Sequence, residues 1–155
     1  MKRTIIGITI LMVFLIFSCN RKNQESKNET ENNQIEQLEK SVSKIYENII
    51  SKNNGKYPSE IKLFGNNEIS DRLKELTGAN YKEIVEKFNV ETPIVSENSI
   101  YKLTGCLKHN CPAYMITILY DSIMDNLNVI VDRNGKIMEF KEKEKIHLTE
   151  TLKRK

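Results

Sequence analysis

The chain has 155 residues and a formal net charge of +3, from 24 Lys and Arg against 21 Asp and Glu. A chain of this length is typical of one domain with one modest core. Residues 1–19 contain two bases and no acid, so without them the excess is about +1. This near balance argues against a nucleic-acid partner, which would need a basic surface.

Residues 1–18 have the pattern of a secretory signal peptide. Lys2 and Arg3 precede an apolar run from Ile5 to Phe17, which is shorter than the roughly 20 apolar residues that span a bilayer. The next residues, Ile16-Phe17-Ser18-Cys19, resemble a bacterial lipobox, which implies lipid on Cys19 after cleavage. We therefore expect an envelope protein anchored to a membrane through Cys19, facing the periplasm or the cell surface. An ordinary signal peptide with an incidental cysteine is the alternative.

A polar linker is expected at residues 19–34, because Asn20 to Gln34 contains no apolar residue and cannot bury enough surface to offset the entropy of ordering. The domain then covers residues 35–155. Five apolar residues recur at steps of three and four and predict a helix over roughly 35–52: Ile35, Leu38, Val42, Ile45 and Ile49. Packing of this helix on the domain's own sheet is the expected outcome, and a homodimer seam is the alternative.

Two more helices are predicted before residue 92. Ile69, Leu73 and Leu76 share a helical face, and Gly78 is placed to end that helix. Asn80 and Glu83 have the spacing of a capping box for the next helix. Four residues of that helix are expected to face inward, namely Tyr81, Ile84, Val85 and Phe88.

From Ile94 onward the hydrophobic period changes towards two, which predicts strands at 99–104, 113–120, 127–132 and 137–142. Asn134-Gly135 is a strong signal for a two-residue hairpin turn, since both positions need positive φ. Helices followed by consecutive hairpins predict an α+β fold, with N-terminal helices packed on an antiparallel sheet of about four to five strands. The charged tail from Lys141 is predicted to be a solvated end.

Cys106 and Cys111 are the remaining cysteines if Cys19 carries lipid. Exported cysteines form disulfides, so we expect these two to close a rigid loop between Gly105 and Pro112 that presents His109. Three alternatives are open: a zinc site of Cys106, His109 and Cys111, for which no fourth ligand is evident; a redox pair; and a disulfide that only pins the loop, with His109 incidental.

The loop sequence is similar to that of a known family, the inhibitors of vertebrate lysozyme (Ivy), whose signature is Cys-Lys-Pro-His-Asp-Cys. Cys106, His109 and Cys111 match this signature, and the similarity extends over roughly residues 57–142. The resemblance implies that the loop enters the active-site cleft of a c-type lysozyme or similar glycoside hydrolase. It also implies that His109 contacts the two catalytic carboxylates there, with Leu107, Lys108 and Asn110 as the other loop residues.

The loop differs from the family signature at three positions. Leu107, Lys108 and Asn110 stand where the family has Lys, Pro and Asp. These differences motivate a second hypothesis, a non-inhibitory envelope lipoprotein of the same fold that acts as a protein-binding or structural module. We expect no enzyme, no cofactor and no metal site, because the chain contains no phosphate-binding Gly-rich loop, nucleophile elbow or helical pair of metal ligands.

Overall fold

The computed structural model describes residues 45–154, with Pro112 by its backbone only. Residues 45–155 belong to one compact unit. The predicted signal peptide, Cys19, the linker and the first ten residues of the predicted 35–52 helix lie outside the described residues. Within the described residues, no helix is long and apolar enough to cross a membrane.

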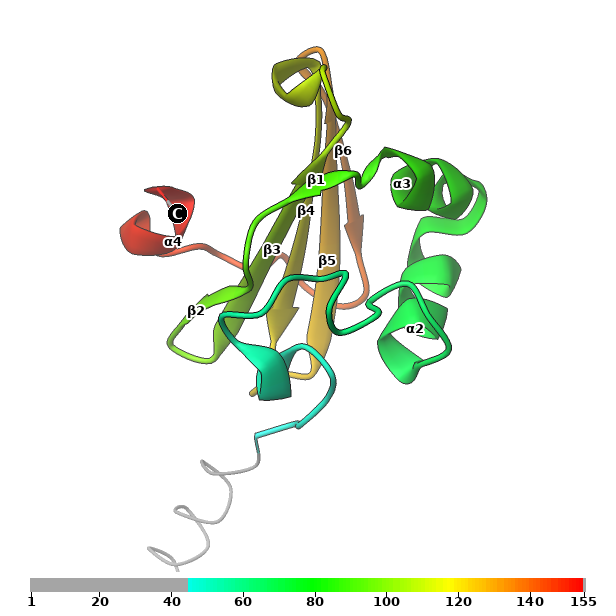
Figure 1. Ribbon diagram of the computed structural model, residues 1–155. Coiled ribbons are helices and arrows are strands. Elements are labelled where there is room, and N and C mark those ends of the chain that lie inside the picture. The colour runs from blue at the N-terminus through cyan, green and yellow to red at the C-terminus, as the bar shows by residue number, and fades with distance from the viewer. Residues whose placement is uncertain (1–44, 155) are drawn as a thin grey trace, which may run out of the picture. The chain divides into compact units, whose positions relative to one another are not determined.

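An antiparallel sheet forms the centre of the fold, as predicted (Figure 1). Its strands are β1 (Val90–Glu91), β2 (Val95–Glu97), β3 (Ile100–Cys106), β4 (Tyr114–Asp121), β5 (Asn126–Arg133) and β6 (Lys136–Lys141). The order is β1-β3-β4-β5-β6, and β2 also pairs with β3. The four predicted strands are confirmed. The two that were missed, β1 and β2, are too short to show a period.

Two α-helices cover one face of the sheet, which confirms the α+β class. They are α2 (Glu68–Thr77) and α3 (Tyr81–Lys87). Side chains from both helices and from the facing side of the sheet form the main core, including Ile69, Leu73, Ile84, Phe88, Leu103, Ile116, Ile118, Leu127, Val129 and Val131. The alternation along β4 and β5 assigns every second residue to this face.

The ends of the two helices follow the prediction only in part. The Asn67 side chain caps α2 by accepting a hydrogen bond from the Ser70 backbone N–H, and Gly78 ends this helix with φ +51°. The predicted capping box at Asn80 is wrong. Asn80 closes a 3₁₀ turn, Gly78–Asn80, with helical backbone angles. Its side chain donates to the Thr77 carbonyl oxygen instead.

The predicted 35–52 helix is wrong for the residues that the structure describes. Residues 45–50 are not helical, and only a short 3₁₀ helix, Ser51–Asn53, follows. The Asn48 side chain accepts hydrogen bonds from the backbone N–H groups of Ile50 and Ser51, which offers the backbone an alternative to helix. In addition, the Tyr46 N–H donates to the Ser122 carbonyl oxygen at the end of β4.

The C-terminal tail was predicted to be a solvated end, and this is wrong. It crosses the second face of the sheet and ends in a short helix, α4 (Glu150–Arg154). Ile146 and Leu152 are buried, as is Leu119 on the strand face that points away from the main core. The Asn126 and Asn128 side chains donate to the Glu144 carbonyl oxygen and so hold the tail in place.

The turn between β5 and β6 is the predicted Asn-Gly hairpin. Asn134 and Gly135 have φ values of +53° and +81°, as a two-residue turn of this type requires. The Asp132 carboxylate accepts a hydrogen bond from the Gly135 N–H at 2.7 Å.

Arg72 on α2 ties three parts of the chain together at the other end of the sheet. Its guanidinium donates two hydrogen bonds to the Glu142 carboxylate, at 2.8 and 2.6 Å, and a third to Asp125 at 2.8 Å. The Tyr120 hydroxyl also donates to Asp125, at 2.9 Å. Because the fork of the guanidinium matches a carboxylate, this geometry fixes α2 against the segment after β6.

Candidate functional site

The two cysteines of the predicted loop are joined. Cys106 ends β3 and Cys111 opens a 3₁₀ turn, Cys111–Ala113, that leads into β4; a disulfide connects them, with Cα atoms 4.8 Å apart. The loop lies at one end of the sheet, next to the turn between β5 and β6 (Figure 1). A zinc site would need both sulfur atoms as thiolates, so the disulfide speaks against that alternative.

A single turn inside the disulfide positions the candidate side chains. The Asn110 N–H donates to the Leu107 carbonyl oxygen at 2.9 Å, so Lys108 and His109 are the central residues of a β-turn. His109 has φ +65°, in the left-handed region where His is one of the less rare non-glycine residues. Lys108, His109 and Asn110 are exposed.

Leu107 has a different position from its three neighbours. It is only partly exposed and packs against the main core, because the Cys106 side chain lies on the opposite face of the sheet and side chains alternate along a strand. Leu107 therefore anchors the loop, and the surface that the loop presents is made by residues 108–110.

The exposed tip offers polar groups with few partners of their own. In the described part of the chain, Lys108 forms no ion pair, and no side-chain hydrogen bond links Asn110 to His109. The imidazole of His109 can donate or accept through either ring nitrogen, depending on its protonation. The tip can thus bind a partner's acidic groups through Lys108 and His109.

Hydrogen bonds brace the loop at its base. The N–H groups of Ala113 and Tyr114 both donate to the Asn110 carbonyl oxygen, at 3.1 Å each. The Asn134 N–H of the β5–β6 turn donates to the Ala113 carbonyl oxygen at 2.8 Å. The neighbouring hairpin therefore supports the loop directly, a contact that the sequence does not signal.

The first residue of β4 links the loop to α3. Tyr114 is buried and pairs in register with Arg133, whose guanidinium carbon lies 5.7 Å from the centre of the tyrosine ring. Arg133 forms an ion pair with Glu83 on α3. Burial raises the pKa of Tyr114, and the positive charge of Arg133 opposes this rise. Sequence reasoning assigned Glu83 to a helix cap and missed this role.

Gly105 allows β3 to pass beneath an aromatic ring just before the disulfide. A Cβ atom at this position would lie 2.5 Å from three ring atoms of Phe88. Phe88 in turn packs edge-on against Phe64, with ring centres 5.3 Å apart. Glycine at this position thus permits a close approach of the strand to the end of α3.

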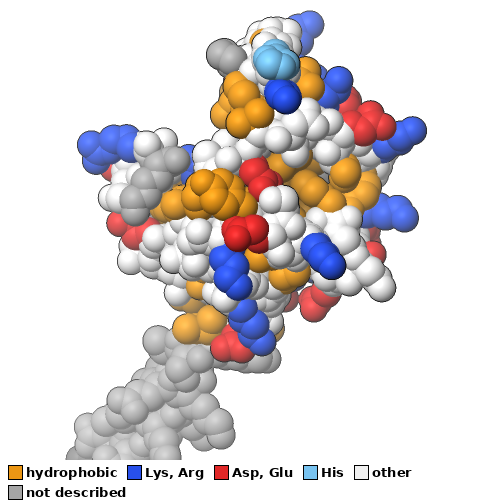
Figure 2. Space-filling view, viewed as in Figure 1, with side chains coloured by type: hydrophobic (Ala, Val, Ile, Leu, Met, Phe, Trp, Pro, Cys, Tyr) orange, Lys and Arg blue, Asp and Glu red, His pale blue; other side chains and the backbone are white. Residues whose placement is uncertain are grey.

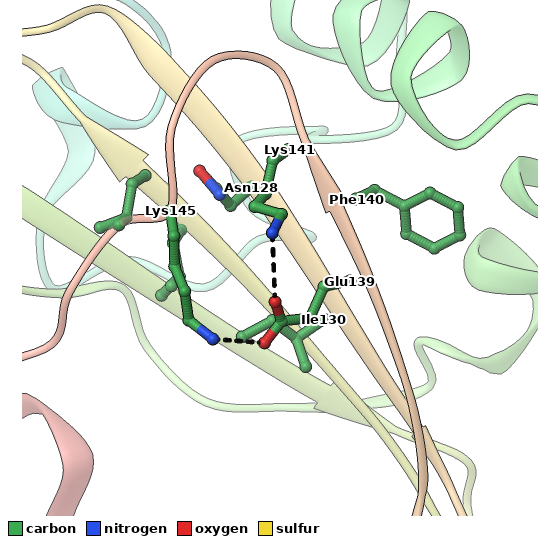
Figure 3. Close-up of a pocket in the computed structure, with 8 residues that line it drawn as sticks. Asn128, Ile130, Glu139, Phe140, Lys141 and Lys145 are labelled. Carbon is green, nitrogen blue, oxygen red and sulfur yellow. Dashed lines mark hydrogen bonds and ion pairs between the residues drawn. The ribbon is translucent and has the colours of Figure 1, made fainter.

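A small pocket lies on the second face of the sheet, under the C-terminal tail (Figure 3). Glu139 lies at its centre between Lys145, at 2.7 Å, and Lys141, at 3.6 Å. The hydrogen bond from Lys145 is the main reason that the pKa of Glu139 lies below its usual range. Since the Glu139 carboxylate is already paired with both lysines, it is not free to bind a ligand, and the exposed loop is the stronger candidate site.

Comparison with known proteins confirms the family resemblance inferred from the loop. Residues 68–155 match the family model described as Inhibitor of vertebrate lysozyme (Ivy). The match covers more than half of the chain and includes both core helices, all the strands and the disulfide loop. No curated protein and no solved structure gave a significant match.

Proposed function

The chain belongs to the family of inhibitors of vertebrate lysozyme (Ivy), and we propose that it inhibits a c-type lysozyme by inserting the loop around His109 into the active-site cleft. The observation that carries this proposal is the exposed His109 at the tip of a disulfide-closed turn. Because the turn is already closed, it loses little conformational entropy on binding.

The chemistry of the target fits this tip. Glycoside hydrolases of this kind place two carboxyl groups on either side of the scissile bond, and both are needed for reaction. A protonated imidazole donates from both ring nitrogens, so His109 can bind both carboxylates at once. The ammonium group of Lys108 adds a second positive charge to the same tip. Inhibition then needs only occupancy of the cleft, and no catalysis by this chain.

We propose further that residues 1–18 are removed, that Cys19 carries lipid and that residues 19–34 act as a spacer. The lipobox resemblance of Ile16 to Cys19 supports this part. The disulfide agrees with an oxidising compartment. Lysozyme acts outside the cytoplasm, so an inhibitor held at the envelope would meet it there.

An inhibition assay with the full-length chain in detergent tests the proposal. The wild type is expected to inhibit a c-type lysozyme, and His109→Ala is expected to lose most of this inhibition. His147→Ala is the matched control, since His147 is the other histidine of the chain and is also exposed. It should inhibit like the wild type.

The opposite results have clear meanings. No detectable binding of the wild type at tens of micromolar would exclude lysozyme inhibition and favour the non-inhibitory binding module. Equal losses in His109→Ala and His147→Ala would exclude insertion of the loop through His109.

A further inference from the structure

A row of five side chains crosses the second face of the sheet where the disulfide loop begins. The strand registers pair Val90 with Cys106, Cys106 with Met115, Met115 with Asp132, and Asp132 with Ile137. Directly paired residues of neighbouring strands point to the same face. These five residues, called here the shoulder row, therefore lie side by side immediately below the loop.

Both ends of the shoulder row expose large apolar side chains. Val90 is 43% exposed and Ile137 is 63% exposed, and they lie on β1 and β6, the two outer strands of the sheet order. Outer strands usually carry charged residues, which discourage contact with other proteins. Further along β6, on the same face, Glu139 and Lys141 follow this rule. Ile137 departs from it at the position nearest the loop.

The C-terminal tail leaves this row uncovered. Its buried residue Ile146 lines the pocket together with Leu119, and the carbonyl oxygen of buried Leu152 accepts a hydrogen bond from Lys102. Lys102 and Leu119 pair with each other in a row four residues further along β3 and β4 from Cys106 and Met115. In Figure 2, hydrophobic side chains lie directly below a histidine at the end that Figure 1 assigns to the loop.

The loop alone is too small for a stable protein interface. A standard interface buries about 800 Å² on each partner, whereas even large aromatic side chains bury only about 150–250 Å² each. Even if Lys108, His109 and Asn110 each buried as much as a large aromatic side chain, together they would stay below the area of a standard interface. Additional surface around the base of the loop must therefore be buried if the loop binds tightly.

We propose that Val90 and Ile137 contact the rim of the lysozyme cleft when the loop is inserted, an inference that rests on the proposed function. Ligand clefts have mostly apolar and aromatic walls around a few polar groups, and in a glycoside hydrolase these polar groups include the two catalytic carboxyl groups. The tip of this protein has the complementary arrangement. His109 and Lys108 meet the carboxylates, and the two apolar side chains flank the loop where the walls end.

The chain offers a matched control for testing this surface. Ile123 and Met124 lie in the turn between β4 and β5, at the other end of the sheet, and are 50% and 60% exposed. We expect Val90→Ser/Ile137→Ser to raise the Kd for a c-type lysozyme about tenfold, as for the loss of a small interface cluster. Ile123→Ser/Met124→Ser removes a similar exposed apolar area. It should bind within about twofold of the wild type, because it lies at the end of the sheet away from the loop.

The experiment uses titration calorimetry of the full-length chain in detergent, with His109→Ala measured in parallel. If the wild type itself does not bind lysozyme, the proposed function fails and this inference fails with it. If His109→Ala weakens binding while the Val90/Ile137 double variant binds like the Ile123/Met124 double variant, the loop proposal stands and the shoulder contact is wrong. Ile137→Leu, which keeps the apolar group, should bind like the wild type.

Discussion

Gly105 has the most confined position next to the disulfide. A strand normally gains from a side chain at every position, and glycine in a strand interior weakens it. Here the ring of Phe88 occupies the space that a side chain would fill, so the aromatic group compensates for the glycine. The contact holds the end of α3 against β3 one residue before Cys106.

Gly105→Ala is therefore expected to destabilise the fold. The added methyl group would meet the Phe88 ring, and overpacking of this kind costs about 1–3 kcal/mol. The free energy of unfolding from denaturant titration measures the effect. In a Phe88→Leu background, Gly105→Ala should lower the free energy of unfolding by less than it does in the wild type, because the two sites are in contact. Strict additivity of the two changes would contradict this explanation.

The residues of the tip were largely predictable, but their support was not. Cysteine spacing and family resemblance identified Cys106, His109 and Cys111. Strand alternation also explains why Leu107 faces the core, although it was grouped with the presented residues. The hydrogen bond from Asn134 to Ala113 depends on two distant turns meeting at one end of the sheet, and no local pattern encodes that.

At the scale of elements, the disulfide closes a short loop between two strands. The chain-entropy model gives such a short loop only about 2 kcal/mol of stabilisation. Cys106→Ser/Cys111→Ser should lower the free energy of unfolding by about this amount. It should weaken lysozyme inhibition by more than tenfold, because the His109 turn loses its closure and must be ordered on binding.

Thermal unfolding and inhibition measured on the same sample separate these two effects. Treatment of the wild type with a reductant should reproduce the double variant in both measurements. A double variant that inhibits as strongly as the wild type would show that closure of the loop contributes nothing to recognition.

The C-terminal tail contributes more to stability than its charged sequence suggests. Leu152 is fully buried against the second face of the sheet, and truncation of a buried leucine costs about 2–5 kcal/mol. Leu152→Ala should lower the denaturant midpoint accordingly. The neighbouring Thr151 is exposed, so Thr151→Ala should leave the midpoint nearly unchanged. Similar midpoints for the two variants would mean that the tail does not pack on the sheet in solution.

The two failed element predictions have different physical origins. The tail contains only a few apolar residues among many lysines and glutamates, so no period indicates burial, yet Ile146 and Leu152 find uncovered sheet. Conversely, Ile45 and Ile49 fit a helical period, but the Asn48 side chain binds the backbone N–H groups that a helix would use. Strong periods predicted β3 to β6 and α2, whereas local side-chain hydrogen bonds decided the start of the described fold and packing on the sheet decided the tail.

At the scale of the whole molecule, the Arg72 cluster joins α2, the β4–β5 turn and the segment after β6. Burial by itself raises the pKa of Asp125, but the hydrogen bonds from Arg72 and Tyr120 outweigh it and hold this pKa below its usual range. A depressed carboxyl pKa adds stability above the unfolded value of about 3.9. That stability is lost as the pH falls through the folded value.

Asp125→Asn should thus be less stable than the wild type at neutral pH, and the difference should shrink below about pH 4. Denaturant titrations between neutral and strongly acidic pH measure this directly. The exposed Asp71 on the same helix as Arg72 supplies the control, since Asp71→Asn at an exposed position should be about as stable as the wild type at neutral pH. A constant gap between Asp125→Asn and wild type at all pH values would exclude this linkage.

Tyr46 donates to Ser122 at one end of β4, while Tyr114 at the other end adjoins the His109 loop. Eight strand residues separate the two ends by about 27 Å. The proposed lipid on Cys19 would attach to the domain through the chain that enters it near Tyr46, whereas the loop lies at the opposite end of β4. A lysozyme bound by the tethered inhibitor would stay near the membrane surface. It would be held away from cell-wall polymer that lies further from the membrane than the linker extends. Tethering would thus add a restriction on the position of the bound enzyme to reversible inhibition of its active site.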